Sequence, residues 1–335
     1  MGLSQSKKFN PANLPDLTGK VIVITGGAAG LGFAITQHLV RKGAKIYIAA
    51  RAIDRAEDAI KRLKAAGLGP GNGQLESLEL DLIDPHTVKR AAEEFMRRES
   101  RLDVLSELRC VSKRAFMMCP YQKTNHGIQD VVMINHIGHF VFIKTLLPIL
   151  KNTASEPNSD VRIVVVSSDG YEAVRHPVKF ETIEDFNLEY KDAVFPWPSL
   201  QRYCYSKLLV CMQVAELQRR LDAEGVPSLF MVATPVTDPA PTDGAQNWLA
   251  TLGTGFLATL ATWIVSLFFT LPTIAAYGTV FASAAPEVRA EPRKYRSAYI
   301  TPPTKNTGLN EKARDPVAAR ELWELTERTL KDIGV

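Results

Sequence analysis

The sequence predicts an α/β protein folded as a single domain around a doubly wound, mainly parallel sheet of seven strands, with helices on both faces. Short apolar runs alternate with longer helical patterns, and a glycine-rich turn joins the first run to the first helical pattern. Strands that alternate with helices need crossover connections, which produce parallel sheets. The chain has 335 residues, 46% of them hydrophobic, and is long enough for one large core. No internal repeat or linker divides it.

The first expected strand, Lys20 to Thr25 (KVIVIT), is a continuous β-branched run, which is typical of a strand buried on both faces of a parallel sheet. Similar runs predict strands at Lys45 to Ala50, Leu75 to Leu80, Leu102 to Leu105, Val161 to Val166, Ser228 to Ala233 and Ser297 to Thr301. Helical patterns predict helices at Leu31 to Lys42, Arg55 to Ala66, Pro85 to Glu99, Asp130 to Leu150, Leu200 to Ala223, Ile274 to Ala284 and Pro316 to Lys331. Residues 1–16 are expected to form a flexible tail, and residues 17–335 the domain.

The composition excludes several classes of function. The 40 basic and 36 acidic residues give a net charge of +4 and are spread along the chain, so no nucleic-acid-binding stripe is visible. The four cysteines lack CxxC spacing, which indicates a reducing compartment. No metal site is predicted. His136 and His139 are interpreted as structural, because no acidic or metal-ligating residue stands near them in the sequence.

The turn from Thr25 to Gly32 (TGGAAGLG) lies where a pyrophosphate would meet the start of the first helix. Backbone N–H groups and the helix dipole favour an anion there, and glycines let the main chain approach it closely. A tight turn before any helix can look the same, but this turn ends the first strand of an alternating α/β pattern. We therefore expect a dinucleotide to contact Thr25, Gly26, Gly30, Leu31 and Gly32.

The second and third strands end with further candidates for cofactor binding. Arg51 follows the second strand at the place where an acidic residue would bind the ribose hydroxyls of NAD. Its guanidinium suits the 2′-phosphate of NADP, so NADP is favoured over NAD, although Arg51 is also compatible with a solvated residue before a helix. Asp81, followed by Leu82, is placed to accept a hydrogen bond from the adenine amino group, or to cap a helix.

Several motifs together carry a family resemblance. They are TGGAAGLG, Asp81-Leu82, NHIGHF at Asn135 to Phe140, the pair Ser167-Ser168, and Tyr203-Cys-Tyr-Ser-Lys207. In this order they resemble the short-chain dehydrogenases/reductases, which have a Rossmann-type fold, and the likeness is greatest to the retinol dehydrogenase and WW-domain oxidoreductase branch. The resemblance spans roughly Leu17 to Ala233. It implies reversible hydride transfer between a nicotinamide and a carbonyl or alcohol carbon.

A tyrosine and a lysine four residues apart project from one face of a helix. A phenol has a pKa near ~10, and an adjacent ammonium lowers it, so Tyr203 becomes a usable general acid or base beside Lys207. The resemblance implies that Lys207 also holds the nicotinamide ribose and that the backbone of Asn135 binds a water of the proton relay. Ser168 would donate a hydrogen bond to the substrate oxygen, with Ser167 as the alternative.

The chain departs from the family pattern at two cofactor contacts. The segment Ser106 to Cys119 replaces a turn of the Asn-Asn-Ala-Gly type, and either a misread exon boundary or a local divergence would explain it. After the sixth strand, Pro235 is followed by Val236, which cannot take the positive φ of glycine. Thr242, with Thr237 behind it, is the candidate for contact with the nicotinamide carboxamide.

No charged residue or histidine occurs from Gly244 to Pro286, and Leu249 to Leu271 is long enough to cross a bilayer. Three interpretations of this region remain open. It could form an apolar cover over a lipophilic substrate, at about 236–286, a surface that docks on a membrane, or a membrane-spanning helix. The N-terminus matches the myristoylation pattern at Gly2. We expect a cytoplasmic protein, with association at the cytoplasmic face of a membrane as an alternative, and a homodimer through the two long helices. The rival functions are a dinucleotide-binding sensor without turnover and a membrane-anchored interaction protein.

Overall fold

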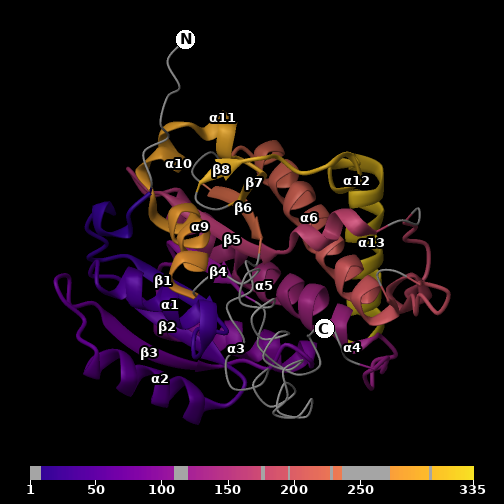
Figure 1. Ribbon diagram of the computed structural model, residues 1–335, viewed down its shortest axis with the longest axis horizontal. Coiled ribbons are helices and arrows are strands. Elements are labelled where there is room, and N and C mark those ends of the chain that lie inside the picture. The colour runs from indigo at the N-terminus through magenta and orange to yellow at the C-terminus, as the bar shows by residue number, and fades with distance from the viewer. Residues whose placement is uncertain are drawn as a thin grey trace, which may run out of the picture.

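The sheet determines the arrangement of the whole molecule. The computed structural model describes residues 9–108, 120–174, 178–194, 197–226, 229–235, 272–301 and 304–335 (Figure 1). In these ranges eight strands form one sheet in the order β3-β2-β1-β4-β5-β6-β7-β8. They are β1 (Val21–Thr25), β2 (Lys45–Ala50), β3 (Gln74–Glu79), β4 (Val104–Glu107), β5 (Val161–Ser167), β6 (Leu229–Pro235), β7 (Ala298–Thr301) and β8 (Lys305–Asn306). The predicted parallel sheet of a Rossmann-type fold is confirmed.

The expected number of strands was wrong by one. β1 to β7 pair in parallel, whereas β8 pairs antiparallel with β7 through Ile300 and Thr301. Two residues are too few to show a hydrophobic period, so the sequence pattern does not reveal β8.

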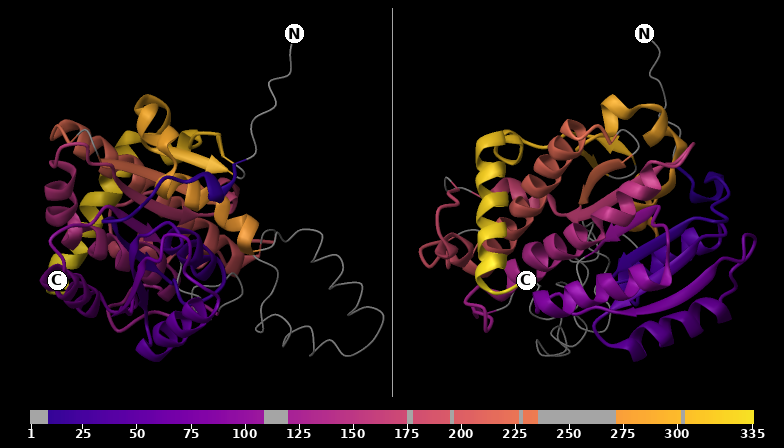
Figure 2. Two further views of the ribbon diagram at one scale, coloured as in Figure 1. Left: turned by 90° about the vertical axis from the view of Figure 1, so that its left-hand side faces the viewer. Right: turned by 180° about the vertical axis from the view of Figure 1, so that it is seen from behind.

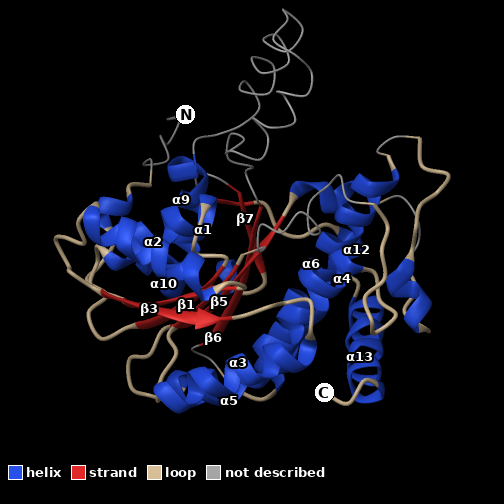
Figure 3. Ribbon diagram, turned by 90° about the horizontal axis from the view of Figure 1, so that it is seen from below, coloured by secondary structure: helices blue, strands red, loops and turns tan. Residues whose placement is uncertain are grey.

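Helices pack against the sheet on two sides, as Figure 3 shows. Alternate residues of β1 belong to different cores: Val21 and Val23 pack with residues of α3, α5 and α6, and Ile22 and Ile24 with residues of α1, α2 and α9. The helices are α1 (Gly30–Val40), α2 (Ile53–Ala65), α3 (Pro85–Arg98), α4 (Asp130–Val132), α5 (Gly138–Ala154), α6 (Pro198–Ala223), α9 (Pro272–Ala284), α10 (Pro286–Ala290), α11 (Pro292–Tyr295), α12 (Glu311–Arg314) and α13 (Pro316–Asp332). Between α4 and α5 the residues Met133–Ile137 form a π-helical turn.

The N-terminal part of the chain joins the fold earlier than the expected boundary at residue 16. Pro11–Asn13 form a 3-10 helix, and Leu14 is buried. The ring of Phe9 lies edge-on to that of Phe281 in α9, with centroids 5.3 Å apart. Aromatic packing therefore holds residues that the sequence assigns to a tail. α9 itself packs on α1 and the sheet, and the substrate cover at about 236–286 stays a prediction.

The C-terminal helix α13 lies beside α6 (Figure 2). Its Trp323 packs edge-on against Phe140 of α5, with ring centroids 4.6 Å apart, and the Arg220 guanidinium of α6 lies 4.5 Å from the Trp323 ring. These contacts cover part of the surface predicted for pairing. A homodimer stays a prediction, and pairing through α5 and α6 would have to use the parts that α13 leaves uncovered.

A single apolar helix in the described ranges, Asp130–Ala154, is long enough to cross a membrane, but 78% of its most apolar window is buried in the protein. It is therefore explained as a core helix. The segment Leu249 to Leu271, on which the membrane hypothesis depends, lies outside the described residues.

Candidate active site

The glycine-rich turn has the shape that a bound phosphate requires. Gly26 and Gly30 have φ angles of +65° and +52°, which L side chains rarely adopt. A Cβ on Gly32 would lie 2.3 Å from the carbonyl oxygen of Gly26, so only glycine fits where α1 meets the turn. Ala29 at the N-cap has no side-chain hydrogen bond to the helix, so the first N–H groups of α1 are left for another acceptor. These features fit a dinucleotide pyrophosphate.

Thr25 and Leu31 belong to this turn and are buried beneath it. Thr25 is buried, and its hydroxyl donates to the Leu108 carbonyl oxygen at 2.7 Å and accepts from the Leu108 N–H at 2.9 Å. Leu31 is buried in the core beneath α1. Thr25 thus ties the carboxyl end of β1 to that of β4, where the strand order reverses and α/β proteins commonly bind nucleotides.

The three other predicted nucleotide contacts follow β2 and β3 at the same edge. Arg51 is exposed directly after β2. Asp81 is half-buried, and its carboxylate accepts from the Ile83 N–H at 3.3 Å, a long hydrogen bond that leaves the other carboxylate oxygen for a ligand. Leu82 is buried, and its carbonyl oxygen lies 2.4 Å from where a Cβ on Gly138 would be. Gly138 therefore lets α5 approach the predicted adenine site closely.

Tyr203 and Lys207 lie together on α6, as the spacing predicts. Both are 2% exposed, and the Lys207 ammonium lies 5.9 Å from the centroid of the Tyr203 ring. The ammonium donates to the Val166 carbonyl oxygen of β5 at 2.7 Å. A buried ammonium close to a phenol stabilises the phenolate, which is the electrostatic condition that proton transfer by Tyr203 needs.

Two serines at the end of β5 differ in how their hydroxyls are used. The Ser167 hydroxyl donates to the Lys207 carbonyl oxygen at 3.1 Å and accepts from the Cys211 thiol at 3.1 Å. Burial raises the pKa of Cys211 to about 12, so this thiol stays protonated and can donate. The Ser168 hydroxyl accepts from the Gly170 N–H at 3.2 Å, which keeps its proton available to donate to a substrate oxygen. This geometry favours Ser168 over Ser167.

Asn135 lies in the π-helical turn between α4 and α5, and π-helical turns are frequent at functional sites. Its amide donates to the Ser206 hydroxyl at 2.9 Å, next to Lys207. Its side-chain oxygen is buried, with no hydrogen-bond partner among the described residues. Asn135 is thus held against α6 beside Lys207, and the role of its backbone in a proton relay stays a prediction.

The two histidines of the NHIGHF segment behave differently from each other. His136 is buried between Gln213 and Thr326, each at 3.0 Å, and burial lowers its pKa to about 3, so the neutral ring has a structural role. His139 has an acidic neighbour in the fold that does not stand near it in the sequence, because Glu107 lies 3.3 Å from it. These residues are 32 positions apart in the sequence, so no local pattern could pair them. Thr242 and Thr237 lie outside the described residues.

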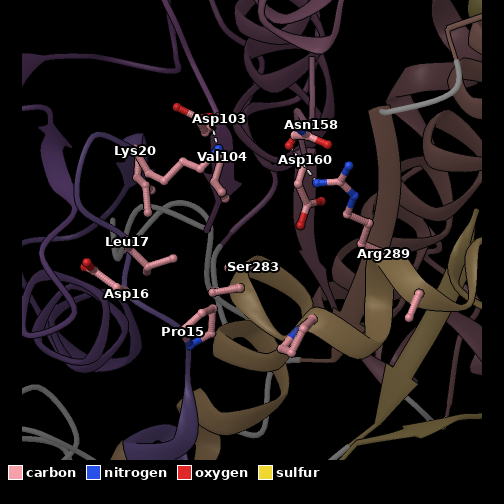
Figure 4. A pocket seen from close by; sticks show the side chains of 14 residues that line it. Pro15, Asp16, Leu17, Lys20, Asp103, Val104, Asn158, Asp160, Ser283 and Arg289 are labelled. Atoms are coloured by element: carbon pink, nitrogen blue, oxygen red, sulfur yellow. Dashed lines mark hydrogen bonds and ion pairs between the residues drawn. The ribbon is translucent and has the colours of Figure 1, made fainter. Parts of the chain in front are cut away.

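A cavity of about 470 Å³ lies at the opposite edge of the sheet, near the amino ends of β1, β4 and β5 (Figure 4). Its lining includes Lys20, Asp103 and Arg289. Lys20 pairs with Asp103 at 3.0 Å, and Arg289 donates to the Asn158 carbonyl oxygen at 2.6 Å. Since these charges already have partners and Tyr203 lies at the other edge, we do not place the chemistry in this cavity.

Comparisons with known proteins agree with this geometry. A family model described as short chain dehydrogenase matches residues 20–176. A short-chain dehydrogenase/reductase from Armillaria gallica is 37% identical over 98% of this chain and 98% of its own length. The chain belongs to the short-chain dehydrogenase/reductase family.

This dehydrogenase/reductase also has a retinol dehydrogenase relative, as the sequence motifs suggested. Retinol dehydrogenase 14 from Mus musculus is 32% identical over 92% of this chain and 85% of its own length. Among solved structures, an uncharacterized protein from Mycobacterium Paratuberculosis superposes with a TM-score of 0.66 and 26% identity, covering 97% of this chain and 98% of the other. The protein is therefore an oxidoreductase of this family with a Rossmann-type NAD(P)-binding fold.

Proposed function

We propose that this dehydrogenase/reductase is an NADP-dependent alcohol dehydrogenase or carbonyl reductase that acts on a lipophilic small molecule. The observation that carries the proposal is the Tyr203–Lys207 pair, buried at the carboxyl end of β5 with the ammonium 5.9 Å from the phenol ring. Burial of two such groups on one helix face costs folding free energy, because each group loses hydration. A role in proton transfer at a substrate oxygen explains why both are buried there.

The cofactor supplies the hydride chemistry when it is bound, and the chain's own residues handle the proton and the substrate oxygen. In the reductive direction the Tyr203 hydroxyl donates its proton to the carbonyl oxygen, and Lys207 stabilises the phenolate left behind. Ser168 donates a hydrogen bond to the same oxygen as negative charge develops on it. Asn135, held by Ser206, borders the route by which Tyr203 regains a proton.

Preference for NADP is part of the proposal and is supported by Arg51. The side chain is exposed at the carboxyl end of β2, where a ribose phosphate of a nucleotide seated on the glycine turn would lie. A guanidinium binds phosphate through two parallel hydrogen bonds, and β2 ends without a carboxylate that would repel it.

The lipophilic substrate and the cellular location are proposed from the sequence and one relative. The uncharged stretch Gly244 to Pro286 provides apolar side chains, and a retinol dehydrogenase, named for a lipophilic alcohol, is a relative. We place the protein in the cytoplasm, where an acyl group on Gly2 would add a weak attachment to the cytoplasmic face of a membrane.

A carbonyl-reduction assay with a matched pair of variants tests this function. NADPH and NADH consumption is followed against a panel of lipophilic aldehydes and ketones, for the wild type, Tyr203→Phe and Tyr205→Phe. Tyr205 is the control, because it is buried on the same helix and its hydroxyl donates to the Asp185 carbonyl oxygen at 2.7 Å. Loss of a general acid predicts that kcat falls roughly 10²–10⁴-fold in Tyr203→Phe, with little change in Tyr205→Phe.

Three outcomes contradict parts of the proposal. Binding of NADPH without turnover of any carbonyl by the wild type would support a dinucleotide sensor. An equal fall of kcat in both variants would show that activity depends on the packing of a buried tyrosine hydroxyl in general, and not on proton donation by Tyr203. More rapid oxidation of NADH than of NADPH would overturn the role of Arg51.

A further inference from the structure

A buried acid–imidazole pair joins β4 to α5 close to the catalytic residues. Glu107, the last residue of β4, and His139, in the first turn of α5, approach to 3.3 Å between a carboxylate oxygen and Nδ1. Their side chains are 0% and 5% exposed. Odd-numbered residues of β4 face the core that contains α5, since Leu105 packs there, so Glu107 points from the sheet toward this helix.

Burial of a carboxyl group at this position costs folding free energy, and packing alone does not explain why the group is there. Among the described residues His139 is the one basic side chain that acts on Glu107, and the Glu107 oxygens accept no well-aligned hydrogen bond there. Burial raises the pKa of Glu107, while His139 opposes this rise. A well-packed apolar residue is commonly as stable as a buried ion pair, so the pair is better explained by a specific task than by stability.

Both ends of the pair connect to residues of the proposed site. Leu108, next to Glu107, exchanges two hydrogen bonds with Thr25 at the start of the glycine turn. His139 stands one helical turn after Asn135, whose amide donates to Ser206 beside Lys207. A short chain of contacts therefore runs from the nucleotide edge, through the pair, to the catalytic face of α6.

The helix is irregular around Asn135, so the position of this residue depends on contacts made by its neighbours. The π-helical turn at Met133–Ile137 interrupts the regular hydrogen-bond ladder of the helix at the place where Asn135 lies, and such turns are frequent at functional sites. Gly138 lies directly against the Leu82 carbonyl oxygen, with no room for a Cβ. Contacts at Gly138 and His139, directly after the turn, thus fix its C-terminal end.

We propose that Glu107 and His139 are positioning residues for the hydride-transfer reaction, holding the π-helical turn so that Asn135 stays against Ser206 and Lys207. The inference rests on the proposed oxidoreductase function. The pair touches neither substrate nor nicotinamide in this assignment. It acts through Asn135 on the return of a proton to Tyr203.

The test measures turnover, cofactor binding and the solvent deuterium isotope effect on kcat in four variants. Glu107→Leu removes the partner of His139, and Glu107→Gln keeps an acceptor for its ring. His139→Gln approaches the pair from the other side, so the test stands if one variant fails to fold. Glu216→Gln is the control, since Glu216 is an equally buried carboxylate on α6 that pairs with Arg219 and Arg220, each at 2.7 Å.

Misplacement of a catalytic group by about 1 Å costs roughly 100-fold, so we expect kcat to fall about 10- to 100-fold in Glu107→Leu and His139→Gln. The isotope effect should rise, because proton return becomes limiting, while the Kd for NADPH stays within about threefold. Glu107→Gln should recover much of the loss. Glu216→Gln should lower stability without changing the isotope effect.

Three results distinguish the failure of this inference from the failure of the function on which it rests. An active wild type, with an unchanged isotope effect in folded Glu107 and His139 variants, would overturn the positioning role alone. A wild type that binds NADPH but reduces no carbonyl would overturn both. Weakened NADPH binding without loss of kcat would instead assign the pair to the nucleotide site and reject its action through Asn135.

Discussion

Substitution of Gly32 by alanine tests the nucleotide turn most directly. A Cβ at this position would lie 2.3 Å from the Gly26 carbonyl oxygen and 2.8 Å from both the Gly26 carbonyl carbon and the Gly27 Cα. All three atoms are backbone, so no side-chain rotation relieves the clash. Contacts below 3.0 Å are essentially never observed for Cβ atoms, so the turn and the helix must separate by at least 0.7 Å.

The magnitude follows from the cost of inserting a methyl group into packed structure, about 1–3 kcal/mol. We expect stability to fall by this amount. If the separated turn loses a similar free energy of interaction with the pyrophosphate, NADPH binding weakens roughly 5- to 150-fold, because each ~1.4 kcal/mol is a factor of ten in Kd.

NADPH titration by protein fluorescence, with urea unfolding of the same samples, measures both quantities. Gly67→Ala is the matched control: Gly67 has a φ of +84°, it lies after α2, and a Cβ added there would meet no atom within 4 Å. Backbone strain should cost about 1–2 kcal/mol there without changing Kd. A folded Gly32→Ala variant that binds NADPH within twofold of the wild type would refute the assignment of this turn to the pyrophosphate.

Two further predictions concern stability. Burial opposes ionisation of Asp103, but hydrogen bonds from Arg101, the Val21 N–H and Lys20 lower its pKa below 3.8. Its contribution is therefore complete at neutral pH and is lost as the pH falls through the lowered value. Asp103→Asn should cost about 3 kcal/mol at pH 7 in urea unfolding. The difference from the wild type should shrink as the pH is lowered below the ordinary carboxyl pKa, and a difference that stays constant throughout acid titration would contradict this account. Trp323→Ala should cost about 3–5 kcal/mol, because Trp323 is 5% exposed against α5 and α6. Trp197→Ala, at a residue 40% exposed, should cost much less, and equal losses would disprove the anchoring of α13 by Trp323.

The local parts of the fold could be predicted because their signals are local. The run KVIVIT needs only its own residues to indicate a buried parallel strand, and β1 begins within one residue of the expected start. The Tyr203–Lys207 spacing requires only one helical turn, so their common face was also predictable.

β4 shows where the sequence pattern fails. The apolar run predicted a strand at Leu102 to Leu105, but the strand is Val104–Glu107, because pairing with β1 and β5 continues through Ser106 and Glu107. Polar side chains end an apolar run, although they do not end a hydrogen-bond ladder. The sequence motif already favoured Ser168 over Ser167, but the contacts that occupy the Ser167 hydroxyl come from Cys211 and Lys207, about 40 residues later, and no local pattern could show them.

The starts of α1 and α3 differ in a way that stability alone does not explain. Both helices follow parallel strands at the same edge of the sheet. At α3 the Asp84 side chain accepts from the His86 N–H, which is worth about 1 kcal/mol. At α1 the N-cap is Ala29, which contributes no such bond. A carboxylate at position 29 would stabilise the helix but would also occupy the N–H groups and repel a phosphate. The uncapped start of α1 is therefore expected where the ligand itself completes the helix.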